Sequence, residues 1–137
     1  MGQQDFTRWQ AGYSVGNWML DNQHKVLLSL CKQTLDCVSD DGLEFVGQFS
    51  LFRDDLLDSL DAHCRSEENL LSSCAYPLLA QHKEEHRESQ SRLNRFLLSA
   101  SAGETGKAEL HELLAQWWMH HIVESDKQFA GAIQRVR

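Results

Sequence analysis

The sequence predicts an all-α protein whose helices pack side by side as a bundle. Three observations lead to this prediction. The length of 137 residues suits one compact domain. Four stretches of the chain repeat apolar residues at steps of three and four. Each stretch also carries histidine or carboxylate side chains on its apolar side. We therefore expect a single domain over residues 1–137, with polar groups that converge on its interior.

The first part of the chain is expected to be an ordered arm followed by a helix. Residues 1–20 combine glycines with Trp9, Tyr13 and Trp18 and lack helical periodicity, so these aromatics should anchor the arm to the body. Asp21 is the expected N-cap of a helix over residues 21–39, whose apolar stripe contains His24. The run from Asp40 to Gly42 favours a turn that ends this helix.

The second and third helices are expected over residues 43–72 and 78–100. His63 and Glu67 fall within the apolar face of the second helix. Pro77 separates the two helices, because it lacks the donor that a helix interior needs but suits a first turn. His82 and His86 lie on the inner side of the third helix. The residues expected on its outer side are Lys83, Glu84, Glu85, Arg87 and Glu88.

The last helix is expected over residues 107–134, after a connection that Gly103 and Gly106 mark. Its apolar face includes Trp117 and His121, and Asp126 follows near its end. This is the fourth segment to place metal-ligand residue types toward the core.

Five histidines and two carboxylates form the candidate site. Residues at i and i+4 of a helix share one face, so His63 with Glu67, and His82 with His86, each offer two ligand groups in one direction. One such pair is common by chance on solvated helices. If these polar groups were all buried without partners, however, each would lower the stability of the fold by a few kcal/mol. A bound metal offsets that cost for the whole set. The predicted ligands are His24, His63, Glu67, His82, His86, His121 and Asp126, with Glu67 and Asp126 bridging two metal ions.

The ligand types narrow the choice of metal. Imidazole and carboxylate suit iron, manganese, cobalt or zinc. The four cysteines show no CxxC or zinc-ribbon spacing, which argues against a structural zinc or iron–sulfur site and favours reduced thiols in a cytosolic protein. Because histidines outnumber carboxylates, the centre is less anionic than a glutamate-rich di-iron site. This favours ligand binding over oxygenase chemistry.

The composition argues against nucleic acid and membranes as partners. The net charge of −7, with no basic stretch, argues against nucleic acid and against an anionic membrane surface. The first residues lack the pattern of a signal peptide, and no apolar run is long enough to cross a bilayer. We expect a cytoplasmic protein whose partner is a small neutral molecule.

Taken together, these motifs resemble those of a bacterial hemerythrin domain over nearly the whole chain. The matching residues are Trp9, Tyr13 to Gly16, Asp21 to Lys25, His63 to Glu68, Tyr76-Pro77, His82, His86, Trp117, His121-Ile122 and Asp126. The resemblance implies an antiparallel, up-down-up-down four-helix bundle. It also implies two iron ions joined by an oxo or hydroxo bridge, which bind dioxygen reversibly.

The resemblance assigns roles within the site. His82, His86 and His121 would bind one iron, while His24 and His63 would bind the other, which keeps an open position for dioxygen. Two positions depart from the family pattern: Cys64 stands where phenylalanine is common, and Trp118 where leucine is common. One change removes volume and the other adds it, so we expect them to compensate. The expected ligand pocket consists of Cys64, Trp117, Trp118 and Ile122.

Three classes of function remain open from the sequence. The first is oxygen storage or delivery. The second is oxygen or redox sensing, in which the iron state controls a signalling domain that is either covalently linked in the native gene or a separate protein. The third is a di-iron enzyme such as a peroxidase or a nitric-oxide-handling protein. We favour binding or sensing over catalysis, because no acid, base or nucleophile outside the ligand set is evident beside the site.

Overall fold

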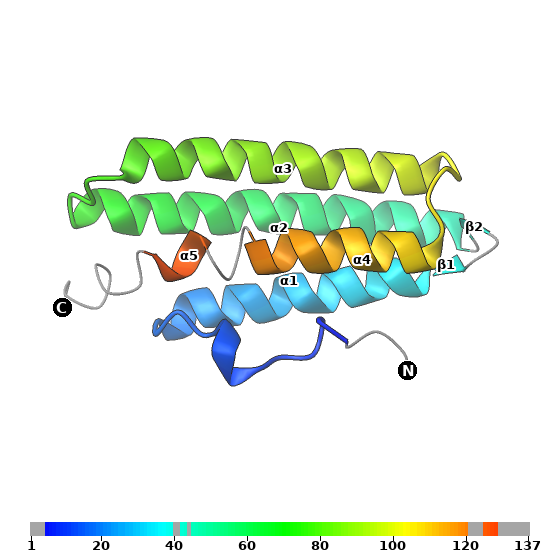
Figure 1. Cartoon of the computed structure of the whole chain (residues 1–137), viewed down its shortest axis with the longest axis horizontal. Coiled ribbons are helices and arrows are strands. Elements are labelled where there is room, and N and C mark those ends of the chain that lie inside the picture. The colour runs from blue at the N-terminus through cyan, green and yellow to red at the C-terminus, as the bar shows by residue number, and fades with distance from the viewer. Residues whose placement is uncertain (1–4, 40–41, 44, 121–124, 129–137) are drawn as a thin grey trace.

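The computed structural model describes residues 5–39, 42–43, 45–120 and 125–128. Its four long helices are α1 (Trp18–Asp36), α2 (Val46–Ser73), α3 (Leu79–Ser101) and α4 (Lys107–Trp117). They run alternately in opposite directions (Figure 1), and α1 and α3 each contact both α2 and α4. This arrangement is the up-down-up-down four-helix bundle that the sequence and the resemblance predict.

The N-terminal arm packs on the bundle through aromatic side chains. It contains a short 3₁₀ helix, η1 (Ala11–Tyr13). Tyr13 is buried, and its hydroxyl donates to the carbonyl of Phe6 at 2.9 Å. The Trp9 ring meets Tyr13 edge to face, and the Lys25 ammonium of α1 lies over Trp9. Trp18, which was expected to anchor the arm, is instead the first residue of α1 and is 78% exposed.

Helix α1 begins three residues before the start that the sequence predicts. The N-cap is Asn17, whose side chain accepts from the backbone N–H of Leu20 at 3.0 Å. Asp21 is not the cap. Its carboxylate accepts from the Val15 N–H at 2.9 Å and from the Ser14 hydroxyl at 2.6 Å, which fastens the arm to the first turn of the helix.

The connections between helices are short. After α1, strands β1 (Val38–Ser39) and β2 (Gly42–Leu43) pair antiparallel, a two-residue ladder that the all-α prediction did not include. Asp40 and Asp41, expected to form the turn, lie outside the described residues. Gly103 ends α3 in the left-handed conformation, with φ of 75°, as is typical of a helix C-terminus.

The predicted helix over residues 107–134 is interrupted. Helix α4 ends at Trp117, and residues 118–120 form a wider, π-type turn. A three-residue helix, α5 (Ser125–Lys127), follows farther along the bundle (Figure 1). Such turns are rare in proteins and occur frequently at functional sites. The positions between these elements, and those after residue 128, are not described.

The interior of the bundle is mainly leucine and aromatic. The buried side chains of α1 to α4 join those of the arm in one large apolar cluster, and a smaller cluster surrounds Val15, Leu20 and Leu71. Burial of this apolar surface holds the helices together. Among the described residues, no helix combines the length and apolar character that a membrane crossing requires.

Ala75, in the connection between α2 and α3, adopts a left-handed conformation with φ of 52°. This conformation crowds the Cβ atom and costs roughly 1 to 2 kcal/mol for a residue other than glycine. We expect Ala75→Gly to stabilise the protein by about 0.5 to 1 kcal/mol, after the larger entropy of the unfolded glycine chain is subtracted. Thermal or urea unfolding measures the change. The same substitution at the exposed, mid-helical Ala62 should instead destabilise by about 1 kcal/mol, and equal effects at the two positions would contradict the assignment of strain.

Candidate metal centre

Four histidines and two carboxylates meet in the interior of the bundle. They form two groups of four residues, and the ligand atoms within each group lie within 4.8 Å of one another. Both groups contain Glu67 and Asp126. The first group adds His24 and His63, and the second adds His82 and His86. All six side chains are buried.

Four elements supply these side chains. His24 comes from α1, His63 and Glu67 from α2, His82 and His86 from α3, and Asp126 from α5. The i, i+4 spacing places both members of each helical pair on the inner face, as the sequence predicts. We call His24 and His63 the α1–α2 half of the site, and His82 and His86 the α3 half.

The two carboxylates lie between the halves. Oε2 of Glu67 is 3.0 Å from Nε2 of His63, while its Oε1 is 2.9 Å from Nε2 of His86. Asp126 is arranged in the same way. Its Oδ2 is 3.0 Å from Nε2 of His24, and its Oδ1 is 3.6 Å from Nε2 of His82. Each carboxylate therefore turns one oxygen toward each half, which is the arrangement that a bridging ligand requires.

In three of the histidines, the other ring nitrogen faces outward, toward a polar side chain. The Nδ1–H of His63 donates to the amide oxygen of Gln23 at 2.7 Å, and the Nδ1–H of His86 donates to the carboxylate of Glu68 at 2.7 Å. Nδ1 of His82 lies 3.6 Å from a carboxylate oxygen of Glu85. With Nδ1 occupied in this way, Nε2 is left as the inward-facing nitrogen that can bind a metal.

Burial and charge set the protonation of the site. Burial, reinforced by the Asp126 carboxylate, raises the pKa of Glu67 well above its usual range. Burial also acts to raise the pKa of Asp126, but hydrogen bonds with His24 and His63 outweigh it and hold the pKa of Asp126 well below its usual range. Burial lowers the pKa of His24 and of His82.

His86 differs from the other histidines. Burial acts to lower its pKa, but the hydrogen bonds to Glu67 and Glu68 outweigh burial and raise the pKa of His86 to about 9. The metal-free site therefore holds protons at neutral pH. A cation that binds there must displace them, so metal binding is coupled to proton release.

The polar atoms of the site fit metal cations. Oε2 of Glu67 and Oδ1 of Asp126 are buried and have no hydrogen-bond partner within the described part of the chain. Nε2 of His24 and Nε2 of His63 are 2.9 Å apart, so two imidazole nitrogens face each other beside two carboxylates. Buried acceptors left unpaired are costly, whereas a cation shared between imidazole and carboxylate groups satisfies them together.

Comparison with known proteins decides the family. The sequence model of the hemerythrin HHE cation binding domain matches residues 15–133. The chain belongs to the hemerythrin family. Its metal-ligand residue types and its four-helix bundle are those of a cation-binding hemerythrin domain, and its two ligand groups could hold metal.

The relatives cover nearly all of this hemerythrin domain. A bacteriohemerythrin of Stenotrophomonas maltophilia is 26% identical over 92% of this chain and 80% of its own length, and one of Pseudomonas aeruginosa is 27% identical over the same shares. A hemerythrin-like protein of Naegleria gruberi is 28% identical over 91% of this chain and 92% of its own. A crystal structure of a leucine-to-tyrosine hemerythrin variant superposes with a TM-score of 0.77 at 21% identity, over 95% of this chain and 98% of that one. This structural likeness supports the fold.

The structure brings six of the seven predicted ligands together. Only His121 is missing from this set, because it lies outside the described residues. His120, which belongs to neither ligand group, is exposed. His111 also lies outside both groups and is half-buried against the ring of Phe6.

The structure describes three of the four residues expected to form the ligand pocket. The fourth, Ile122, lies outside the described residues. The Trp118 ring is buried and meets His24 edge to face, with 5.7 Å between ring centres. Cys64 is buried close enough to Glu67 that burial and this carboxylate together raise the pKa of its thiol, so the thiol stays protonated. The indole N–H of Trp117 donates to the backbone carbonyl of Ser89, in α3, at 3.0 Å.

Cys64 and Trp118 approach the site from different sides. Cys64 projects from α2 and interacts with Gln90 of α3, whereas Trp118 follows α4 and contacts α1 and the arm. Helices α2 and α4 are diagonal neighbours in the bundle. None of these contacts gives the two residues a shared partner. The volume compensation expected between them therefore stays a prediction.

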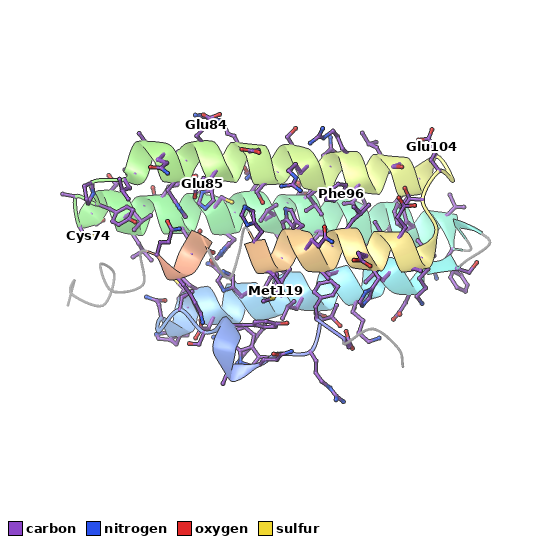
Figure 2. The ribbon with its side chains drawn as sticks, in the orientation of Figure 1. Cys74, Glu84, Glu85, Phe96, Glu104 and Met119 are labelled. Carbon is purple, nitrogen blue, oxygen red and sulfur yellow. The ribbon has the colours of Figure 1, made fainter. Side chains whose placement is uncertain are left out.

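Sequence reasoning missed the outward partners of the histidines. Gln23 and Glu68 each adjoin a predicted ligand in the chain, and that adjacency was the available signal. Glu85 was expected to face solvent. Its side chain is 34% exposed against 67% for Glu84, and Figure 2 shows Glu84 pointing away from the bundle. Glu85 lies on the His82 side of α3 because the two residues are one helical turn apart.

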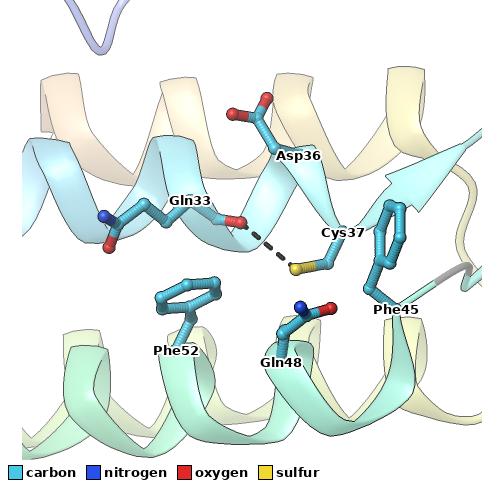
Figure 3. Close-up of a pocket in the computed structure, with 6 residues that line it drawn as sticks. All are labelled: Gln33, Asp36, Cys37, Phe45, Gln48 and Phe52. Atoms are coloured by element: carbon cyan, nitrogen blue, oxygen red, sulfur yellow. Dashed lines mark hydrogen bonds between the residues drawn. The ribbon is translucent and has the colours of Figure 1, made fainter.

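A second concave region lies away from this centre. A surface pocket of about 320 Å³ lies between the end of α1 and the start of α2 (Figure 3). Its lining residues, none of which belongs to the two ligand groups, are Gln33, Asp36, Cys37, Phe45, Gln48 and Phe52. The Cys37 thiol donates to the Gln33 carbonyl at 3.4 Å, and burial raises its pKa. A protonated thiol is a poor nucleophile, so the buried ligand groups are the stronger candidate site.

Proposed function

We propose that the chain is a non-haem di-iron protein that binds dioxygen reversibly. The observation that carries this proposal is the pair of buried ligand groups that share Glu67 and Asp126. Two groups with a common carboxylate pair suit two metal ions held side by side, and the family match favours iron. The proposed ligands are His24, His63, Glu67, His82, His86, His121 and Asp126.

The iron pair would supply the electrons that reversible dioxygen binding requires. Residues of the chain would position and shield that pair. Glu67 and Asp126 hold the two halves together, while Gln23 and Glu68 fix the rings of His63 and His86 in the orientation that presents Nε2. If His121 completes the α3 half, the α1–α2 half has one histidine fewer and is the side with room for dioxygen.

The surroundings of the α1–α2 half support a binding role. Trp118 covers His24, and Tyr13 of the arm covers Trp118, so apolar rings separate this half from water. Water exclusion stabilises a bound neutral ligand. Cys64, a potentially reactive group beside the site, is a neutral thiol and is not poised as a nucleophile. Storage or delivery of dioxygen, or sensing of it, therefore fits better than an enzymatic role.

The iron content of the purified protein tests this proposal. We expect about two iron ions per chain, because the two ligand groups share two carboxylates. The oxidised protein should show ligand-to-metal charge-transfer absorption, and dioxygen should bind reversibly to the reduced protein. Metal analysis that gives one zinc per chain, without such absorption, would contradict the assignment. Irreversible oxidation with turnover of peroxide would favour the enzymatic alternative.

A further inference from the structure

Two of the outward hydrogen bonds form a matched pair that differs in charge. In the α1–α2 half, Nδ1–H of His63 donates to Gln23 at 2.7 Å. In the α3 half, Nδ1–H of His86 donates to Glu68, also at 2.7 Å. The donor atom and the distance are the same. The acceptor is a neutral amide in one half and a carboxylate in the other.

A carboxylate behind a metal-binding imidazole makes the ring a stronger ligand. It withdraws the Nδ1 proton toward itself, which raises the electron density at Nε2 and adds a negative charge near the cation. An amide orients the ring without adding that charge. The Glu68 side chain is only 24% exposed, so water screens its charge incompletely.

The remaining contacts increase this difference. The α3 half has a second carboxylate close by, since Glu85 lies 3.6 Å from Nδ1 of His82. In the α1–α2 half, Nδ1 of His24 is buried without a hydrogen-bond partner among the residues that the structure describes. Glu67 and Asp126 contribute to both halves and therefore do not distinguish them.

The geometry points to unequal cation affinities in the two halves. The α3 half binds its cation first and more tightly, and Glu68 determines that order. This inference rests on the proposed metal centre and adds the unequal affinity of its two positions. Glu68 acts through His86, so it is a positioning residue. The α1–α2 half then fills second and remains the more weakly held position.

A charge-conserving exchange of the two acceptors tests the inference. In the double variant Gln23→Glu/Glu68→Gln, the carboxylate moves from the α3 half to the α1–α2 half while the net charge and side-chain sizes are kept. The structure accommodates this exchange. In the wild type, the Gln23 amide donates to the Ser66 hydroxyl at 3.3 Å, and that hydroxyl donates to the Ala62 carbonyl at 3.1 Å. The hydroxyl can rotate away from this carbonyl and donate to a carboxylate at position 23 instead.

Metal-free protein titrated with Zn²⁺ provides the readout. Zinc is redox-silent, and NMR of the imidazole nitrogens shows which rings bind it. In the wild type, the first equivalent should shift Nε2 of His82 and His86. In the double variant, it should shift Nε2 of His24 and His63. Calorimetry should show that Glu68→Gln alone weakens the first binding step by about 10- to 100-fold. The control Glu88→Gln makes the same charge change at an exposed position of α3 and should leave that step unchanged.

The outcomes separate this inference from the proposed function. An unchanged order of filling in the double variant would overturn the role of Glu68 and leave the metal centre in place. The same holds if both halves of the wild type fill together. His121 is present in both proteins, so an order that it dictates would also appear as an unchanged order. Failure of both proteins to bind Zn²⁺ would overturn the metal centre and this inference together.

Discussion

Replacing Glu67 with alanine is expected to empty the metal centre and to destabilise the protein at the same time. This one carboxylate lies between the four histidines of the two ligand groups. Its oxygens are 2.9 Å and 3.6 Å from Nε2 of His86 and His82, and 3.0 Å and 3.8 Å from those of His63 and His24. Its loss therefore disrupts both halves, whereas loss of one histidine disrupts a single half. Iron content should fall below one ion per chain.

The expected cost in stability comes from the groups that remain. Removal of one partner from a buried charged cluster typically costs about 3 to 5 kcal/mol, because the other groups stay buried without compensation. Unfolding of the iron-loaded protein, measured together with its iron content, checks both effects. Glu67→Gln separates charge from volume and should also lose iron, but with less destabilisation. Glu84→Ala, at an exposed position of α3, should change stability by less than about 0.5 kcal/mol. Normal iron content in Glu67→Ala would mean that this carboxylate is not a bridge.

The helices were predictable wherever their pattern was local. The predicted ranges 43–72 and 78–100 lie close to α2 and α3, because apolar spacing and Pro77 act within a few residues of the helix ends. The start of α1 was not predictable in this way. Asn17 and Asp21 are both good capping residues, and the choice depended on Asp21 bonding to Val15 and Ser14 of the arm. The β1–β2 ladder is too short for any periodicity.

The candidate site shows the same division between local and long-range information. The i, i+4 spacing of His63 with Glu67, and of His82 with His86, is a property of a single helix and could be predicted from it. The acceptors behind the rings could not. Gln23 lies on α1 and serves His63 of α2, and Glu68 lies on α2 and serves His86 of α3. Such contacts depend on how neighbouring helices rotate against each other, which apolar periodicity leaves undetermined.

Trp118 is the residue whose replacement should most change the behaviour of bound dioxygen. Its ring is fully buried and lies between Tyr13 and His24, with centres 5.4 Å and 5.7 Å away. Truncation to alanine would leave a cavity beside the α1–α2 half. Buried Nδ1 of His24 and the Tyr13 hydroxyl would offer polar partners to water, so the cavity would fill rather than stay dry.

We therefore expect Trp118→Ala to accelerate the autoxidation of the oxygenated protein, because water and anions then reach the site. The same change should cost about 3 to 5 kcal/mol of stability, as large-to-small substitutions of buried aromatics do. Trp118→Leu, which restores the residue common in the family, should give an intermediate decay rate. Stopped-flow absorption of the oxygenated form measures the decay.

A matched variant distinguishes access of water from loss of stability. Leu110 is a fully buried residue of α4, the helix that directly precedes Trp118, and its replacement by alanine should cost about 2 to 5 kcal/mol. Its ring-free side chain makes no aromatic contact with His24, so Leu110→Ala should leave the decay of the oxygenated form unchanged. If Leu110→Ala and Trp118→Ala accelerated decay equally, general loosening of the bundle would be the cause. If Trp118→Ala decayed at the wild-type rate, the indole would not shield the site, and the water-excluding role assigned to Tyr13 and Trp118 would be wrong.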